Sequence, residues 1–212
     1  MTALLRPFAS AGHLSADVMP NLVPQIDTTL VTRARAGDRA AHAEIYTAFS
    51  SPIFTLARRM LASKASAEDV LQETFVDVLR KIGDFRGEAE LGFWIRRIAI
   101  NKCLMYMRSS WVSRREPEGD ERIAAEPARA TGLDEQLALE RALDALADVA
   151  RAVVWLHDVE GYTHKEIGRL MGLSTSFSKS QLARAHERLR VLLEGQNEAI
   201  GDELCVQVLK TC

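Results

Sequence analysis

Long segments rich in helix-forming residues and poor in helix breakers constrain the fold of this chain more than any other feature. Only 12 glycines and 6 prolines punctuate the 212 residues, and most of the prolines lie before residue 28 or between residues 112 and 133. Elsewhere Ala, Leu, Arg and Glu dominate, and these residues have high helix propensity. No window shows the sustained alternation of Val, Ile or Thr that is typical of a half-buried strand. The sequence therefore predicts an all-α fold.

The positions of prolines and charges predict two small helical domains joined by a flexible acidic linker. The linker segment carries two prolines and many acids, which is a linker composition. The first residues carry three prolines and are predicted to be flexible, with Met19 as an alternative start. The predicted segments are an extension at 1–27, a first domain at 28–111, the linker at 112–133, a second domain at 134–194 and a tail at 195–212.

In the first domain, apolar residues recur at helical spacing in several segments. The clearest case is Ser66–Ile82, where Ser66 with Asp69 resembles a capping box. Its predicted apolar stripe consists of Val70, Leu71, Thr74, Phe75, Val78, Leu79 and Ile82. A first helix is predicted to begin at Thr28 and to end in a turn at Gly37–Asp38. Further helices are predicted over Ala40–Phe49, Pro52–Leu61 and Leu91–Arg108, the last with Trp94 and Ile95 inward and Arg96, Arg97, Asn101, Lys102 and Arg108 on a basic side.

The distribution of charge is more informative than its sum. The formal net charge of −2 would by itself argue against a nucleic-acid partner. From Arg80 to Arg115, however, nine basic residues stand against three acids, whereas ten acids stand against three basic residues from Glu116 to Asp148. The near-neutral total therefore averages a basic surface and an acidic connector.

The second domain contains the pattern of a helix-turn-helix unit. Its helices are predicted over Leu133–Leu146, Val149–His157, Thr163–Met171 and Ser174–Leu193. Thr163 with Glu166 forms a capping box, Gly172 permits a tight turn, and Ser174 caps the following helix. That last helix carries basic and amide side chains on its outside, which suits a DNA major groove. An ordinary helical hairpin with a solvated charged face is the alternative interpretation.

Other classes of protein have less support in the sequence. Cys103, Cys205 and Cys212 give no disulfide framework, although a zinc or redox role for the last two stays open. No apolar run approaches a membrane span or a secretory signal, which favours a cytoplasmic protein. No catalytic nucleophile, acid–base pair, metal-ligand set or cofactor motif is visible, so we expect neither an enzyme nor a cofactor.

Taken together, residues 67–108 and 139–190 resemble the extracytoplasmic-function (ECF) sigma factors of bacterial RNA polymerase. These proteins consist of two helical domains called σ2 and σ4. The resemblance covers Thr28 to Leu193, and it implies core RNA polymerase and promoter DNA as partners, with an anti-sigma factor as a further candidate. It implies that the helix containing DVLQETF at 69–75 binds the largest polymerase subunit. The residues expected in that contact are Asp69, Gln72, Glu73 and Asp77.

The resemblance also implies two DNA-binding segments. The loop and helix from Phe85 to Asn101 match the promoter-melting element, and the residues expected to contact proximal promoter DNA are Arg86, Glu88, Arg96, Arg97, Asn101 and Lys102. In the second domain, the residues expected to contact the distal element are Ser176, Lys179, Ser180, Gln181, Arg184 and Arg188. This recognition helix departs from the family pattern, because Ser178 replaces a buried Val, with Phe177 expected to pack in compensation, and Gln181 replaces a common Arg.

Two rival functions remain to be weighed. A one-component regulator would use the helix-turn-helix to bind DNA and the first half to sense a ligand, but it would not need the basic helix at 91–108. A helical enzyme would need a convergent set of catalytic groups.

Overall fold

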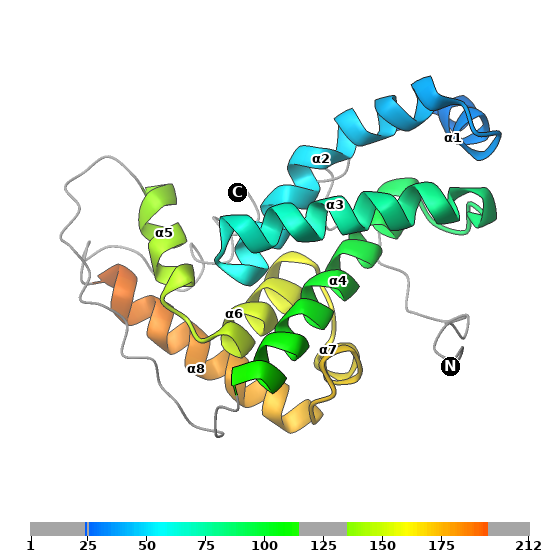
Figure 1. Ribbon diagram of the computed structural model, residues 1–212. Coiled ribbons are helices and arrows are strands. Elements are labelled where there is room, and N and C mark those ends of the chain that lie inside the picture. Colours follow the sequence, from blue (N-terminus) through cyan, green and yellow to red (C-terminus); the bar gives the residue numbers. More distant parts are fainter. Residues whose placement is uncertain (1–23, 25, 115–134, 195–212) are drawn as a thin grey trace.

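A computed structural model describes residue 24 and residues 26–114 and 135–194, and all regular structure in these ranges is helical (Figure 1). The predicted all-α class is confirmed. Most of the expected extension and linker, and the whole expected tail, lie outside the described residues. Met19, Cys205 and Cys212 are among the residues that are not described. No described helix is long and apolar enough to cross a membrane.

The N lobe is built from four α-helices. They are α1 (Thr28–Arg35), α2 (Arg39–Leu61), α3 (Lys64–Lys81) and α4 (Leu91–Arg114), with a short 3-10 turn, η2 (Ile82–Asp84), after α3. Asp27 and Asp38 cap α1 and α2 by accepting hydrogen bonds from backbone N–H groups of the first turn. Helix α2 packs against both α3 and α4, so the three long helices share one buried centre.

The prediction of two helices on either side of Pro52 is wrong, because α2 continues through this proline. A proline inside a helix costs about 3 kcal/mol through a lost hydrogen bond and a steric clash. The continuous helix keeps Ile45, Phe49, Ile53 and Leu56 fully buried along one stripe. Each such side chain contributes about 1.5–3 kcal/mol on burial. Packing therefore outweighs the local preference for a break.

The start of α3 also differs from the prediction. Ser63, not Ser66, is the N-cap, and its hydroxyl accepts from the backbone N–H of Ser66. Ser66 lies inside the helix, where its hydroxyl donates to the Tyr106 hydroxyl of α4 at 2.7 Å. Leu79, expected on the inward stripe, is instead exposed. The sequence pattern placed the cap at Ser66 because it could not reveal that this hydroxyl bonds to Tyr106, 40 residues away.

The C lobe contains α5 (Glu135–Asp144), α6 (Asp148–Val154), α7 (His164–Met171) and α8 (Thr175–Glu194). The helix expected over Val149–His157 is shorter than predicted, since a π-helical turn, η3 (Trp155–Val159), follows α6. The capping box of Thr163 and Glu166 is confirmed, as is Gly172 as the left-handed end of α7, with φ +73. The predicted helix-turn-helix unit is therefore present as α7 and α8.

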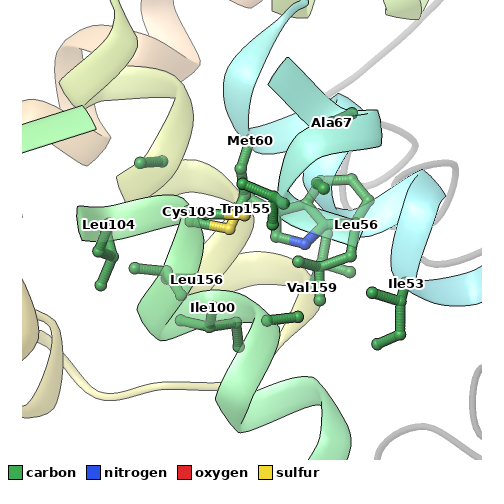
Figure 2. Packing of buried hydrophobic residues seen from close by; sticks show 14 of the residues in the cluster. Ile53, Leu56, Met60, Ala67, Ile100, Cys103, Leu104, Trp155, Leu156 and Val159 are labelled. Carbon is green, nitrogen blue, oxygen red and sulfur yellow. The ribbon is translucent and has the colours of Figure 1, made fainter. Parts of the chain in front are cut away.

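The two lobes pack against each other around a continuous hydrophobic core. Trp155, Leu156 and Val159 of η3 insert between α2 and α4 of the N lobe (Figure 2). Their neighbours in this view are Ile53, Leu56, Met60, Ala67, Ile100, Cys103 and Leu104. Cys103 is buried, as expected for a small core residue. The π-helical turn, which the sequence did not predict, is therefore the element that joins the lobes.

The turn between α7 and α8 leads to a test of the helix-turn-helix packing. A Cβ at Gly168 would lie 2.7 Å from the carbonyl oxygen of Leu173, a backbone atom that moves only with the turn. We expect Gly168→Ala to lower the free energy of unfolding by about 1–3 kcal/mol, measured by thermal or urea denaturation. Gly83→Ala is the matched control, because its Cβ meets nothing within 4 Å and it should be neutral or stabilising. Equal stability of both variants would contradict the close approach.

Candidate functional site

The residues predicted to bind polymerase divide into two pairs on α3. Asp69 and Gln72 are exposed and make no hydrogen bond or ion pair within the described part of the chain. Glu73 and Asp77 instead approach the Lys102 ammonium group of α4, at 3.2 and 3.3 Å. Burial opposes ionisation of Asp77, but Lys81 and Lys102 outweigh it and lower the pKa of this carboxyl. Asp69 and Gln72 are thus available to a partner, while the exposed Glu73 and the half-buried Asp77 brace α3 against α4.

Sequence reasoning missed an apolar component of the same α3 face. Val76 and Leu79 are 46% and 41% exposed, and they follow Gln72 at the i+4 and i+7 positions of one helix stripe. The expected inward orientation of Leu79 concealed this pattern. A surface that combines acids, an amide and adjacent aliphatic side chains is suited to a protein partner.

The predicted melting segment presents an exposed loop and an exposed helix edge. Arg86 and Glu88 lie in the loop before α4 with both side chains about four-fifths exposed, and their charged atoms are 3.8 Å apart. Arg97 and Asn101 are exposed on α4. Trp94 is half-buried and packs on Phe85, with ring centroids 5.2 Å apart, which supports the expected role in packing. Lys102 also belongs to this set but is engaged by the two acids of α3.

Arg96 was expected on the exposed basic side of this helix, and that expectation is wrong. Its side chain is 5% exposed, and its guanidinium group forms a two-point ion pair with Glu160 of the C lobe. The Nε–Oε2 distance is 3.1 Å. The indole Nε1 of Trp155 donates to the same carboxylate at 3.0 Å. No local pattern could have revealed this, because the partner lies 64 residues along the chain.

The predicted distal-promoter residues lie on the outer surface of α8. Ser176, Lys179, Ser180, Arg184 and Arg188 are exposed, and Gln181 is half-buried. Ser178 is fully buried, and its hydroxyl lies 3.1 Å from Nδ1 of His164 on α7. Phe177 does not compensate by packing, since it is 39% exposed. The buried Ser178, which replaces a Val of the family pattern, is therefore accommodated by its hydrogen bond to His164 and not by packing of Phe177.

A histidine–aspartate cluster fixes the recognition helix to the rest of the C lobe. The Asp158 carboxylate lies 2.8 Å from Nδ1 of His157 and 2.6 Å from Nε2 of His186 on α8. Burial opposes its ionisation, but the two imidazoles outweigh this effect and lower the pKa of Asp158. The rings of His157 and His164 stack with centroids 4.5 Å apart, and burial together with His157 lowers the pKa of His164. Within the described residues no group of three ligands could hold a metal ion.

Comparison with known proteins identifies the family. The family model described as sigma-70 region 2 matches residues 45–112, and that described as sigma-70, region 4 matches residues 136–189. The ECF RNA polymerase sigma factor SigM of Mycobacterium tuberculosis H37Rv is 30% identical over 175 residues, which cover 82% of this chain and 88% of SigM. The chain belongs to the ECF sigma factors. The RNA polymerase sigma-H factor of Pseudomonas aeruginosa PAO1 is 27% identical, with 82% of this chain and 96% of that protein covered.

Solved structures of sigma factors are also similar. The sigma factor RpoE from Bartonella quintana, crystallised with the anti-sigma factor NepR, aligns with a TM-score of 0.49 and 23% identity over 72% of this chain and 96% of that chain. CnrH, in complex with the cytosolic domain of CnrY, aligns with a TM-score of 0.47, 23% identity, and coverage of 79% and 96%. In family terms, the N lobe corresponds to σ2 and the C lobe to σ4. The chain is a transcription initiation factor that acts with RNA polymerase at promoters, and its relatives are regulators rather than enzymes.

Proposed function

We propose that the σ2 lobe binds core polymerase through the outer face of α3 and melts the promoter with the segment 85–101. In the same proposal, the σ4 lobe reads the distal promoter element with α8. The observation that carries the proposal is the surface of α8, because its basic side chains are exposed on a helix that packs against α5, α6 and α7. A rigid, cationic recognition helix is what major-groove binding requires.

The melting function rests on exposed groups that suit an unpaired strand. Extracting a base from the duplex costs a few kcal/mol, and a protein without ATP offsets this only by binding the separated strand better than the duplex. Arg86 and Arg97 can hold phosphates, and the amide of Asn101 can hydrogen-bond to a base edge. The exposed Arg86–Glu88 pair contributes little to stability, so breaking it for DNA costs little.

The site of action and the regulation of the protein follow from its partners. We place the chain in the cytoplasm, where bacterial RNA polymerase works. Similar solved sigma factors are held by anti-sigma factors, so an anti-sigma factor is a candidate regulator of this chain as well. Transcription in vitro tests the function directly: purified core polymerase with this chain should initiate at discrete sites on genomic fragments. A lack of discrete initiation above core polymerase alone would refute the proposed function.

The first prediction concerns the polymerase contact. Asp69→Lys combined with Gln72→Lys reverses the outer face of α3 without disturbing the acids that hold Lys102. We expect at least a tenfold loss of affinity for core polymerase, because two cations replace an anion and an amide in the proposed interface. Glu44→Lys, an equally simple reversal at an exposed acid of α2, is the control. Unchanged affinity in fluorescence titrations, with unaltered circular dichroism, would remove these residues from the interface.

The second prediction concerns melting. Arg86→Ala combined with Asn101→Ala should reduce open-complex formation more than binding of duplex promoter, because the proposed contacts form only with the separated strand. Permanganate reactivity of thymines in the bubble reports opening, and an electrophoretic shift on duplex promoter reports binding. Arg80→Ala, at an exposed residue of α3, controls for the loss of one positive charge. Bubble reactivity equal to that of the parent would exclude these two residues from the melting site.

A further inference from the structure

We propose that the face of the σ2 lobe that σ4 covers is a phosphate-binding surface for promoter DNA. In the absence of DNA, the Glu160 carboxylate of σ4 takes the place of a phosphate at Arg96. This proposal rests on the proposed melting function of α4. It adds a phosphate site at Arg96 and names Glu160 as the group that competes with phosphate for that site. Arg96 precedes the exposed Arg97, within the segment assigned to the separated strand. Its fork of donors meets the Glu160 carboxylate in the two-point geometry that arginine also adopts with phosphate.

Most of the remaining polar contacts between the lobes have the same polarity. Arg58 of α2 meets Asp144 at 2.8 and 3.1 Å, and Arg59 meets Glu140 at 2.6 Å. Arg108 of α4 donates to the backbone carbonyl of Leu170, at the negative end of α7. In these contacts and in the Arg96–Glu160 pair, the σ2 lobe supplies the cation and the σ4 lobe supplies the oxygen. Arg151 of σ4 is the exception, because its Nε donates to the Met60 carbonyl of σ2 at 3.2 Å. The covered surface is thus basic, and σ4 presents to it the charges that a nucleic-acid backbone would present.

A purely structural role explains the central pair less well. A buried ion pair adds little net stability, because desolvation of both charges offsets their attraction. A permanent contact between lobes could use apolar residues in its place, as Trp155 and Leu156 already do beside it. A charged pair that can be rehydrated, or exchanged for a phosphate, suits a contact that opens. We infer that the separated strand and σ4 exclude each other from Arg96.

A thiol on the covered face gives a direct readout of opening. Cys103 is buried beside Trp155 and Leu156 (Figure 2), and burial raises the pKa of its thiol, so it reacts slowly while the lobes are closed. In a parent with Cys205→Ser and Cys212→Ser, the rate of labelling by a thiol reagent measures separation of the lobes. Binding to a pre-melted promoter bubble, titrated by fluorescence anisotropy, measures the DNA site.

The decisive variant is Glu160→Gln, which removes the charge but keeps the shape and a hydrogen-bond acceptor for Trp155. We expect faster Cys103 labelling and roughly tenfold tighter bubble binding, which is the scale of one charge-assisted hydrogen bond. Adding Arg96→Gln should remove the gain in affinity and lower the salt slope by about one. Glu44→Gln, with the same charge change at an exposed acid of α2, should alter neither measurement.

Several results would overturn the proposal. If Glu160→Gln speeds Cys103 labelling without tightening bubble binding, the Arg96–Glu160 contact is only structural. If the tighter bubble binding survives the addition of Arg96→Gln, the phosphate binds at another residue. If Glu160→Gln does not fold, the pair Arg58–Asp144 replaces it. Asp144→Arg should speed labelling and tighten bubble binding, whereas Arg58→Glu should speed labelling without tightening binding, because it removes a cation of the covered face. The two together should restore closure. The absence of that restoration would also refute the inference. If polymerase carrying the parent chain still initiates normally, the proposed function survives such a failure.

A separate observation assigns a base contact to Phe177. This side chain is exposed in the first turn of α8, on the stripe that continues through Gln181 and Arg184 to Arg188. The N-terminal residues of a recognition helix are those that reach base edges. The neighbouring core position is already filled by Ser178 with its bond to His164, so Phe177 has no inward role. We infer that its ring contacts the 5-methyl group of a thymine in the distal promoter element.

Replacement of single thymines by deoxyuridine tests this inference, because the two bases differ only by the methyl group. The parent holoenzyme should lose several-fold affinity at one thymine of the distal element, and Phe177→Ala should lose that sensitivity without changing the footprint. Val191→Ala, at an exposed apolar residue near the other end of α8, should behave like the parent. If no thymine responds, or if Phe177→Ala keeps the response, the inference fails. Loss of all sequence-specific binding by the parent would instead refute the proposed function.

Discussion

The ion pair between Arg96 and Glu160 is the interaction on which the arrangement of the two lobes depends. Both side chains are buried, and Glu160 accepts from Trp155 of the π-helical turn, so each charge needs its partner. Trp155 belongs to the apolar contact and also donates to the carboxylate, so packing and charge are satisfied by the same residues. Removing either charge from such a site leaves the other buried and unpaired, which typically costs about 3–5 kcal/mol. The lobes should therefore close or separate as whole units.

The closed arrangement covers the two proposed DNA-binding regions to different extents. The outer stripe of α8, including Arg184 and Arg188, stays exposed while σ4 rests on σ2. On α4, Arg97 and Asn101 are exposed but Arg96 is covered. Recognition of the distal duplex is thus compatible with closed lobes, whereas full engagement of the separated strand requires them to part. This order of events suits a factor that should not hold single-stranded DNA before polymerase is bound.

Local patterns predicted most of the fold, and distant partners account for what they missed. The capping box at Thr163, the glycine end of α7 and the apolar stripe of α8 depend on residues within a few positions of one another, and each was predictable. The burial of Arg96 and the hydrogen bond of Ser178 depend on partners 64 and 14 positions away. The continuous α2 is a third kind of failure, because a helical stripe packed on two neighbours overrides the local effect of Pro52. The exposed positions of Asp69, Gln72 and Asn101 were predictable because they follow from helix periodicity.

Separation of the lobes costs free energy, and the source of that free energy indicates when separation should occur. The polar contacts can be rehydrated, and the buried Arg151, which binds the Met60 carbonyl at 3.2 Å, keeps its bonds to Leu146 and Asp148 within its own lobe. The apolar residues of the π-helical turn have no such substitute, because exposing them costs roughly 25 cal/mol for each Å². A partner shifts this equilibrium only by the difference in its affinity for the open and closed forms. If polymerase binds the two lobes at separated positions, it binds only the open form. The free energy that uncovers Arg96 should then come from holoenzyme assembly rather than from DNA binding.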